Sequence, residues 1–263
     1  MAFGESILQR LADKQIILPI LENQIRADEW PDSFQVTIDT APYYGLDEEG
    51  NPDGWFHPSS HSLRTPRQLY YEFHPDHKHL IEREPWGVQS LMTVAVGTSL
   101  HGIIQTQMQM AGLCSTEDIE PGYENVAHHV RGRGDMVARH PTEGPVCIEI
   151  KSRTSYKFDQ TTIQDMPSWE IQLLLAMDNL GKRYNTDFTY GVLLMVETGY
   201  PFRMRELRVP RNDTLLAETY AKFDYVRECI RINTPPELCC SYKSAEMKSC
   251  AARHACWLKD HPA

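Results

Sequence analysis

The sequence predicts an α/β fold in which a mixed central sheet is flanked by helices. From residue 86 onward, the apolar patterns follow the order helix, up to three strands, helix, two strands and helix. The hydrophobic content of 41% and the aromatic content of 10% are typical of a folded globular protein. At 263 residues, the chain is long enough for one large domain, or for one domain with an elaborated end.

The charge and the N-terminal residues argue against two classes of protein. The net charge of −10 argues against a protein that coats nucleic acid by bulk electrostatics. Residues 1–18 mix apolar with charged side chains, unlike a secretory signal, and no segment approaches the ~20 apolar residues of a membrane span. We therefore expect a soluble intracellular protein with no membrane partner, and no disulfide framework among its seven cysteines.

The N-terminal part of the chain is predicted to contain helices and one strand. A helix is expected over residues 5–11, and Pro19 should interrupt it. Residues 20–25 suggest a second short helical piece, and alternating apolar residues predict a strand over 34–38. Residues 47–54 are polar and rich in turn formers, so they predict a loop.

The next elements begin the predicted core. Ser59-Ser60 is expected to cap a helix that runs through residues 66–71. Residues 86–112 carry apolar side chains at helical spacing and predict a long helix. A linker is expected over 115–123, followed by a short strand over 126–130.

The second half of the core alternates helix and strand. An amphipathic helix is predicted over residues 168–181, with Gly181 as its C-terminal signal. Residues 190–196 have the composition of a buried strand, and residues 203–209 alternate as a hairpin partner would. A last helix is predicted over 213–232.

Composition divides the chain into three expected parts. Residues 1–58 form an extension, and residues 59–234 form the core. Pro235-Pro236 marks the border of a cysteine-rich tail, residues 235–263, that is expected to pack on the core.

The spacing of Asp135, Glu149 and Lys151 points to a specific chemistry. Glu149 and Lys151 are two residues apart on a predicted strand, so their side chains share one face. Asp135 is expected on the preceding strand, with residues 140–145 as the turn between them. Two carboxylates suit hard cations such as Mg²⁺ or Mn²⁺, and an amine beside them can hold a reacting phosphate or orient a water. The pattern therefore indicates a nuclease centre.

The charge around this pattern is locally positive. Between residues 131 and 157 there are six basic and three acidic side chains, an excess of three positive charges. A basic rim around an acidic metal site suits DNA cleavage, whereas the alternative interpretation is a solvated strand face. The candidate DNA-binding residues are Arg133, Arg153, Tyr156 and Lys157.

Five motifs together resemble the PD-(D/E)XK nuclease superfamily, and more closely its RecB-like exonuclease branch, which includes CRISPR-associated and phage-encoded exonucleases. A lone E-x-K carries no information, but five motifs in this order are hard to obtain by chance. The resemblance covers about residues 59–256, and its restriction-endonuclease-like core matches the predicted order of elements. The motifs are Ser59–Tyr71, Gly97–His101 (G-x-x-x-H), Gly132–Asp135 (G-x-x-D), Glu149–Ser152 ((D/E)-x-K-(S/T)) and Gln172.

The resemblance assigns roles that agree with the chemistry of the side chains. Asp135, Glu149 and the backbone carbonyl of Ile150 would ligate Mg²⁺ or Mn²⁺, with His101 as an additional ligand. Lys151 would orient the attacking water or stabilise the pentacovalent state.

Two of these assignments have plainer alternatives. His101 could instead be satisfied within a helix interface, although its Gly-x-x-x-His context favours the metal ligand. Gln172 would hold DNA or a water near the site, or would be a solvated glutamine on a helix. The tyrosine that should follow in the family's Q-x-x-x-Y motif is replaced by Ala176, so Tyr156 is considered as a substitute.

The cysteine-rich tail leaves three interpretations open. Many RecB-like exonucleases bind a [4Fe–4S] cluster through four cysteines, and Cys250-x5-Cys256 matches the last two. The other two family positions hold Thr65 and Met247 instead. The alternatives are a rearranged cluster with Cys239 or Cys240 and a fourth ligand such as Cys114 or His254, a zinc site of Cys240, Cys250, Cys256 and His254, and free thiols packed as small apolar groups.

The leading functional hypothesis is a metal-dependent DNA exonuclease. It would act on single strands or duplex ends in recombination, repair or phage DNA processing, in the cytoplasm of a bacterium or a phage-infected cell. One alternative is an endonuclease of the same fold. Another is a DNA- or protein-binding module whose metal site is idle. For either function, the expected partners besides DNA are a second copy of the chain in a homo-oligomer or a protein of a recombination or repair complex.

Overall fold

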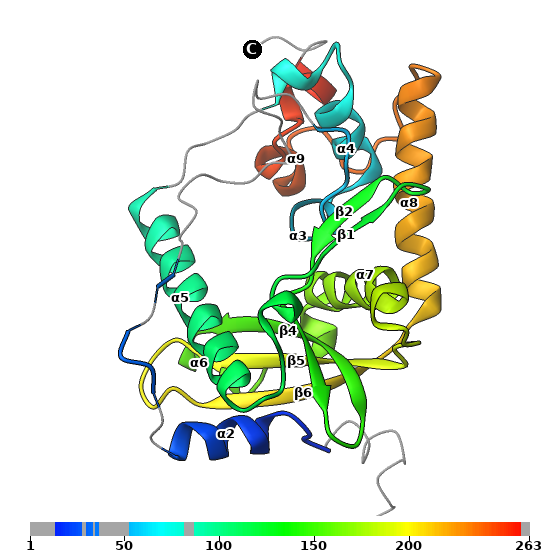
Figure 1. Cartoon of the computed structure of the whole chain (residues 1–263). Coiled ribbons are helices and arrows are strands. Elements are labelled where there is room, and N and C mark those ends of the chain that lie inside the picture. The colour runs from blue at the N-terminus through cyan, green and yellow to red at the C-terminus, as the bar shows by residue number, and fades with distance from the viewer. Residues whose placement is uncertain (1–13, 28–29, 34, 37–52, 82–86, 259–263) are drawn as a thin grey trace, which may run out of the picture. The chain divides into compact units, whose positions relative to one another are not determined.

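The computed structural model of the chain describes residues 14–27, 30–33, 35–36, 53–81 and 87–258 (Figure 1). Contacts divide the chain into two compact units. Unit 1 comprises Met1–Thr40, Gly87–Tyr123 and Gly132–Asn212; unit 2 comprises Ala41–Trp86, Glu124–Arg131 and Asp213–Ala263.

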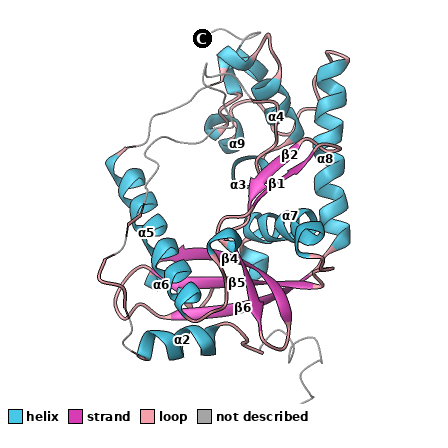
Figure 2. Ribbon diagram, viewed as in Figure 1, coloured by secondary structure: helices cyan, strands magenta, loops and turns pink. Residues whose placement is uncertain are grey.

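Unit 1 is built on a four-stranded sheet in the order β3-β4-β5-β6 (Figure 2). The central pair, β4 and β5, is parallel, while β3 and β6 run antiparallel to their neighbours. The sheet is therefore mixed, as the sequence predicted. Its strands are β3 (Met136–His140), β4 (Gly144–Arg153), β5 (Tyr190–Glu197) and β6 (Met204–Pro210).

Helices cover both faces of this sheet. Helix α7 (Pro167–Tyr184) connects the parallel strands β4 and β5 and packs on one face. A Cβ atom on Gly191 of β5 would lie 2.8 Å from Leu173 and 2.9 Å from Met177 of α7, so a larger residue there would force these side chains to shift. Helices α2 (Leu18–Arg26) and α5 (Val88–Met110) share a buried apolar cluster with the other face.

The N-terminus of α2 is fixed by a side chain from the sheet. The carboxylate of Glu206 on β6 accepts hydrogen bonds from the backbone N–H groups of residues 16, 17 and 18, at 2.9, 2.9 and 2.8 Å. A helix has no internal acceptors for its first N–H groups, and an acidic group there also complements the helix dipole. Glu206 therefore attaches α2 to the sheet at a point remote in sequence.

Unit 2 is mainly helical. Helix α4 packs against α8, and a second buried cluster gathers around Tyr70 and Tyr71. Its helices are α3 (Pro58–His61), α4 (Pro66–Phe73), α8 (Asp213–Arg231) and α9 (Ala245–Ser249), followed by a π-turn at His254–Leu258. Short elements complete the chain: 3₁₀ turns at Lys78–Leu80, Thr116–Asp118 and Ile163–Asp165, helix α6 (Ser155–Phe158), and the hairpin of β1 (Gly122–Asn125) and β2 (Val130–Arg133).

The predicted fold class is confirmed, and most long elements lie where the sequence indicated. The helix predicted over 86–112 is α5, and the helix predicted over 213–232 is α8. The strand predicted over 190–196 is β5, and it pairs with β6 as the expected hairpin. The short helical piece predicted over 20–25 is α2, with Pro19 in its first turn.

Two predicted helix boundaries are wrong. Ser59 and Ser60 lie inside α3, and the cap of α4 is Thr65, whose side chain accepts a hydrogen bond from the N–H of Gln68 at 3.3 Å. Helix α7 continues through Gly181 to Tyr184 and ends at Asn185, which takes the left-handed conformation with φ of 47°.

Two strand predictions also need correction. Residues 126–129 form the turn between β1 and β2, so the strand predicted over 126–130 is wrong; only Val130 is in a strand. Asp135 lies immediately before β3 and not on it. The segment 115–123, predicted as a linker, contains a 3₁₀ turn and the start of β1.

Several predictions fall outside the described residues. These are the helix over 5–11, the loop over 47–52 and most of the strand over 34–38, of which Gln35 and Val36 are described and are not in a strand. Among the helices that the structure does describe, none combines the length and apolar character needed to cross a membrane.

Candidate nuclease centre and thiol pocket

Asp135 is anchored where the chain enters β3. Its backbone carbonyl accepts hydrogen bonds from the N–H of Glu120 at 3.0 Å and from the side chain of Gln105 at 3.1 Å. Because Met136 is paired with Ile148 in the antiparallel β3–β4 register, Asp135 lies beside the next residues of β4. Its Oδ2 accepts the N–H of Ile150 at 2.6 Å. Its other oxygen, Oδ1, lies 3.7 Å from Nδ1 of His101.

Glu149 and Lys151 lie on the same face of β4, as predicted. The Nζ of Lys151 is 2.5 Å from Oε1 of Glu149 and donates to Oε1 of Gln172 at 3.0 Å. Gln172 comes from α7, which covers this face of the sheet. The exposed fraction is 19% for the Lys151 side chain and 6% for that of Glu149. The amine is thus held between a carboxylate and an amide in a site largely shielded from water.

The positive charge of Lys151 does not offset the effect of burial on the carboxyl groups of Asp135 and Glu149. Burial raises the pKa of Glu149 to about 7, and the neighbouring charge of Asp135 adds to the rise. Burial also raises the pKa of Asp135, although Lys151 opposes this. Burial alone would lower the pKa of Lys151, but the two carboxylates outweigh it and raise that pKa. A further cation beside the two carboxyl groups would favour their charged forms and so lower both pKa values.

His101 reaches the same place from α5. Its Nδ1 is 3.7 Å from Oδ1 of Asp135, and its ring is hydrogen-bonded to the backbone of Ile150. Because the N–H of Ile150 is already donated to Asp135, the carbonyl is the group that meets the histidine. Burial, followed by the charge of Lys151, lowers the pKa of His101. A neutral imidazole is the form that binds a metal.

Glycine explains the G-x-x-x-H spacing. A Cβ atom on Gly97 would lie 3.3 Å from Oγ of Ser152, which is tighter than ordinary contact. Gly97 thus lets α5 approach β4 closely, and His101, about one helical turn further on, then reaches Ile150 and Asp135.

The chemical types of the candidate ligands at this site suit a hard divalent cation. Two carboxylates, one carbonyl and one imidazole are oxygen-rich ligands of the sort that Mg²⁺ and Mn²⁺ accept, with water completing the shell. In the described part of the chain, no three His, Cys, Asp or Glu side chains form a ready-made set of metal ligands. The candidate site offers three such side chains, His101, Asp135 and Glu149. They are not arranged around a common point, because Glu149 is paired with Lys151.

The predicted DNA-binding residues lie in different surroundings. Arg133 is 71% exposed and forms an ion pair with Glu120 at 2.9 Å. Arg153 ends β4, where its guanidinium lies over the ring of Trp169, 5.5 Å from the centroid. Tyr156 is 83% exposed on α6, and Lys157 follows it on the same helix.

Three contributors to the site were missed by the sequence analysis. Glu120 lies in a loop, with no motif to mark it, yet its charge acts on Asp135 and His101. Gln105 is one helical turn after His101, and Trp169 is three residues before Gln172, so helical spacing could have identified both. Ala176 is buried 3.5 Å from the Cβ position of Gly134, where a tyrosine ring would not fit.

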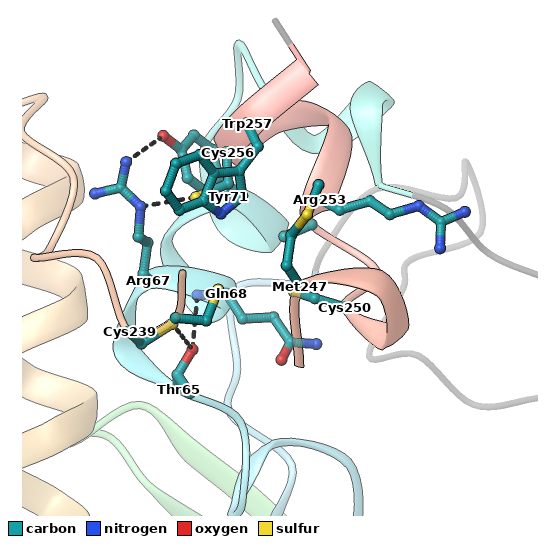
Figure 3. Close-up of a pocket in the computed structure, with 12 residues that line it drawn as sticks. Thr65, Arg67, Gln68, Tyr71, Cys239, Met247, Cys250, Arg253, Cys256 and Trp257 are labelled. Carbon is teal, nitrogen blue, oxygen red and sulfur yellow. Dashed lines mark hydrogen bonds between the residues drawn. The ribbon is translucent and has the colours of Figure 1, made fainter. Parts of the chain in front are cut away.

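All four tail cysteines line one pocket in unit 2 (Figure 3). Nε of Arg67 lies 2.9 Å from Sγ of Cys256 and donates to it, while Sγ of Cys239 contacts Oγ1 of Thr65 at 3.4 Å. Burial raises the pKa of Cys256 despite this arginine. The four thiols are Cys239, Cys240, Cys250 and Cys256.

An unpartnered donor also lines this pocket. Nε1 of Trp257 is buried and has no hydrogen-bond partner among the described residues. A thiolate in the pocket could accept from it, but the four cysteines do not form a ready-made set of metal ligands among the described residues. Met247 lines the pocket as well, whereas His254 does not.

The remaining cysteines are separate from this pocket. Cys114 packs against the core of unit 1, where burial raises the pKa of its thiol to about 12, and it is not among the residues that line the pocket. Cys147 and Cys229 are buried in the apolar interiors of unit 1 and unit 2, as expected for core thiols.

Solved structures that resemble the chain include two that are distant in sequence. No protein-family model matches the chain, and no curated protein matches its sequence. The crystal structure of SSO0001 is 14% identical, with 94% of this chain and 94% of that chain covered and a TM-score of 0.37. An alkaline exonuclease (LHK-Exo) from Laribacter hongkongensis is 13% identical, with 68% of this chain and 89% of that chain covered and a TM-score of 0.39.

Proposed function

We propose that the chain is a metal-dependent DNA nuclease of the RecB-like exonuclease type. The observation that carries the proposal is the convergence of Asp135, Glu149, Lys151, Gln172 and His101, which come from a loop, a strand and two helices. Lys151 contacts both Glu149 and Gln172, and Asp135 contacts β4 through the backbone of Ile150. This arrangement combines metal-binding carboxylates with a cation that can face a phosphate.

The residues that would hold the metal are Asp135, Glu149, His101 and the backbone carbonyl of Ile150. Carboxylates favour Mg²⁺ or Mn²⁺, and the imidazole moves the preference towards Mn²⁺. A bound cation would lower the pKa of a water and neutralise charge on the scissile phosphate.

The chain's own groups supply the positioning. Lys151 is fixed by Glu149 and Gln172, so its ammonium can donate to a phosphate oxygen or orient a water without reorganising. The low exposure of Lys151 and Glu149 strengthens each of these electrostatic contacts. Arg133, Arg153 and Tyr156 would contact single-stranded DNA or the end of a duplex.

Digestion of end-labelled linear DNA, single- and double-stranded, with Mg²⁺ and with Mn²⁺ tests the proposal. Asp135→Ala and Lys151→Ala should each abolish degradation while circular dichroism shows an intact fold. Lys182→Ala, which removes an exposed lysine from the end of α7, is the matched control and should retain activity.

The outcomes separate the competing functions. Near-normal activity in both site variants would remove the catalytic assignment. Cleavage of circular DNA would identify an endonuclease. DNA binding by the wild-type protein without any cleavage would identify a binding module with an idle site.

We also propose that the thiol pocket holds a thiolate-bound metal, either an iron–sulfur cluster or zinc. Four thiols line it, Arg67 donates to one of them, and Trp257 offers a buried donor without a partner. Cys239 would take the place that Thr65 leaves without a thiol, since the two side chains touch. Such a metal would attach the tail to α4.

Purification without oxygen, followed by a visible spectrum and by iron, sulfide and zinc analysis, tests this second proposal. A brown protein with iron and sulfide indicates a cluster, and a colourless one with zinc indicates a zinc site. Cys239→Ser should lose most of the metal, whereas Cys114→Ser in unit 1 should keep it. A wild-type protein containing neither metal would contradict the proposal.

A further inference from the structure

Glu149 and Lys151 form a row along β4, here called the catalytic row. The edge of the sheet beyond this row carries exposed aromatic side chains. Strands β4 and β5 are parallel and end together, with Arg153 paired to Glu197. The segments 154–166 and 198–203 therefore leave the sheet at the same edge. Ligands of α/β proteins bind at the carboxyl ends of parallel strands, and Glu149 and Lys151 approach this end along β4.

Arg153 and Trp169 lie next to Lys151 and Gln172, on β4 and α7 respectively. On β4, Arg153 is two residues beyond Lys151 and so lies on the same face, about 7 Å further along the strand. On α7, Trp169 is three residues before Gln172, about one turn away. The contact of Lys151 with Gln172 is thus followed by the stacking of Arg153 on Trp169, at 5.5 Å.

Three exposed aromatic residues belong to the two segments at this edge. Tyr156 is 83% exposed, Tyr200 is 90% exposed and Phe202 is 57% exposed. The segments are in contact, because the N–H of Thr198 donates to the carbonyl of Arg153 at 2.8 Å. Covering aromatic rings that are so open to water with another flat apolar surface lowers the free energy of the system.

Arg203, which immediately precedes β6, and Arg205 on β6 hold the α6 segment in place. The guanidinium of Arg203 pairs with Glu197 and with Asp159, each at 2.9 Å. The guanidinium of Arg205 donates to the backbone carbonyls of Phe158 and Asp159, at 2.8 and 3.2 Å. The aromatic surface is therefore preorganised, which lowers the entropy cost of binding.

We propose that Arg153, Tyr156, Trp169, Tyr200 and Phe202 form a stacking surface for unpaired bases of a DNA strand. The inference rests on the proposed nuclease function, because it places these bases next to the phosphodiester at Lys151. Aromatic stacking beside a cation is the usual way in which proteins bind single strands, whereas a duplex hides the faces of its bases. The site would thus select single-stranded over paired DNA.

Binding of fluorescent oligonucleotides tests the surface without requiring cleavage. The probes are a 20-nucleotide thymidine strand and a strand of the same length with abasic sites, which keeps the phosphates and lacks the bases. Tyr200→Ala/Phe202→Ala should weaken binding of the thymidine strand about tenfold or more and leave the abasic strand unchanged. Tyr225→Ala, which removes an exposed tyrosine from α8 in unit 2, is the control.

The outcomes distinguish a wrong surface from a wrong function. Equal losses on both strands, no loss on either, or no binding by the wild-type protein would overturn the stacking surface. Hydrolysis of bis(p-nitrophenyl) phosphate with Mn²⁺ reports the catalytic site alone and should be the same in the double variant. If that diester is not hydrolysed while the base-dependent binding is seen, the nuclease function fails and the stacking surface stands.

Discussion

Two buried carboxyl groups of unit 1 have opposite pKa shifts because their neighbours differ. Glu149 lies beside Asp135, and burial raises its pKa to about 7. Burial acts in the same direction on Asp118, but hydrogen bonds from Arg139 and Ser115 outweigh it and lower the pKa to about 2. Arg139 donates to both oxygens of Asp118, at 3.2 and 3.0 Å. At Asp118 the hydrogen bonds outweigh burial, whereas at Glu149 the single amine of Lys151 does not offset burial and the charge of Asp135.

The low pKa of Asp118 predicts a pH-dependent contribution to stability. Its folded pKa of about 2 lies below the unfolded value of about 3.9, so the contribution is present above about pH 5 and is lost as the pH falls towards 2. We expect about 1 kcal/mol at pH 7, after allowing for solvent around the half-exposed Arg139. Urea unfolding of wild type and Asp118→Asn between pH 7 and 3 measures it. A difference in unfolding free energy that does not change with pH would contradict the assignment.

At the scale of elements, the distance between α5 and β4 controls the position of His101. Gly97→Leu places side-chain atoms where Ser152 now lies, so we expect a loss of about 1–3 kcal/mol in unfolding free energy and a loss of Mn²⁺-dependent activity. Ser152→Ala in the same chain should restore part of both. Gly87→Ala, at the cap of the same helix with open space around it, is the control. A fully active Gly97→Leu would show that the close approach is not needed.

The attachment of α2 is a second prediction at this scale. Glu206→Ala leaves three N–H groups at the start of α2 without an acceptor, so we expect a loss of about 3 kcal/mol in unfolding free energy. Glu206→Gln retains an acceptor oxygen and should lose less. Urea denaturation of both variants measures the difference, and equal losses would mean that the contact contributes through packing and not through hydrogen bonds.

The elements also show which features a sequence can predict. Long periodic segments such as α5 and α8, and the shared face of Glu149 and Lys151, follow from local spacing. The end of α7 does not, because Gly181 lies inside the helix beneath its C-terminal turn: a Cβ there would lie 2.9 Å from the carbonyl of Thr186, and Asn185 ends the helix instead. Contacts between remote segments, such as Cys239 with Thr65, leave no local pattern at all.

At the scale of the whole molecule, metal binding should be visible as a change in stability. A ligand that binds only the folded state at about 100 times its dissociation constant stabilises it by about 2.7 kcal/mol. We therefore expect saturating Mn²⁺ to raise the melting temperature of the wild-type protein by about 5 °C or more. Asp135→Ala should not respond, and Lys182→Ala should respond as wild type does. An equal rise in wild type and Asp135→Ala would locate the bound metal elsewhere.

The two units differ in how they draw on the chain. Every segment of unit 1 lies before residue 213, whereas unit 2 requires α8 and the tail, residues 213–263. During synthesis on a ribosome, the sheet with Glu149 and Lys151 can thus assemble once residue 212 has emerged, before residues 213–263 of unit 2 are available. Residues 53–81 must meanwhile wait for α8, their main packing partner, with apolar surface uncovered. A pause in translation between residues 81 and 213 would therefore lengthen the time for which this apolar surface of unit 2 stays exposed.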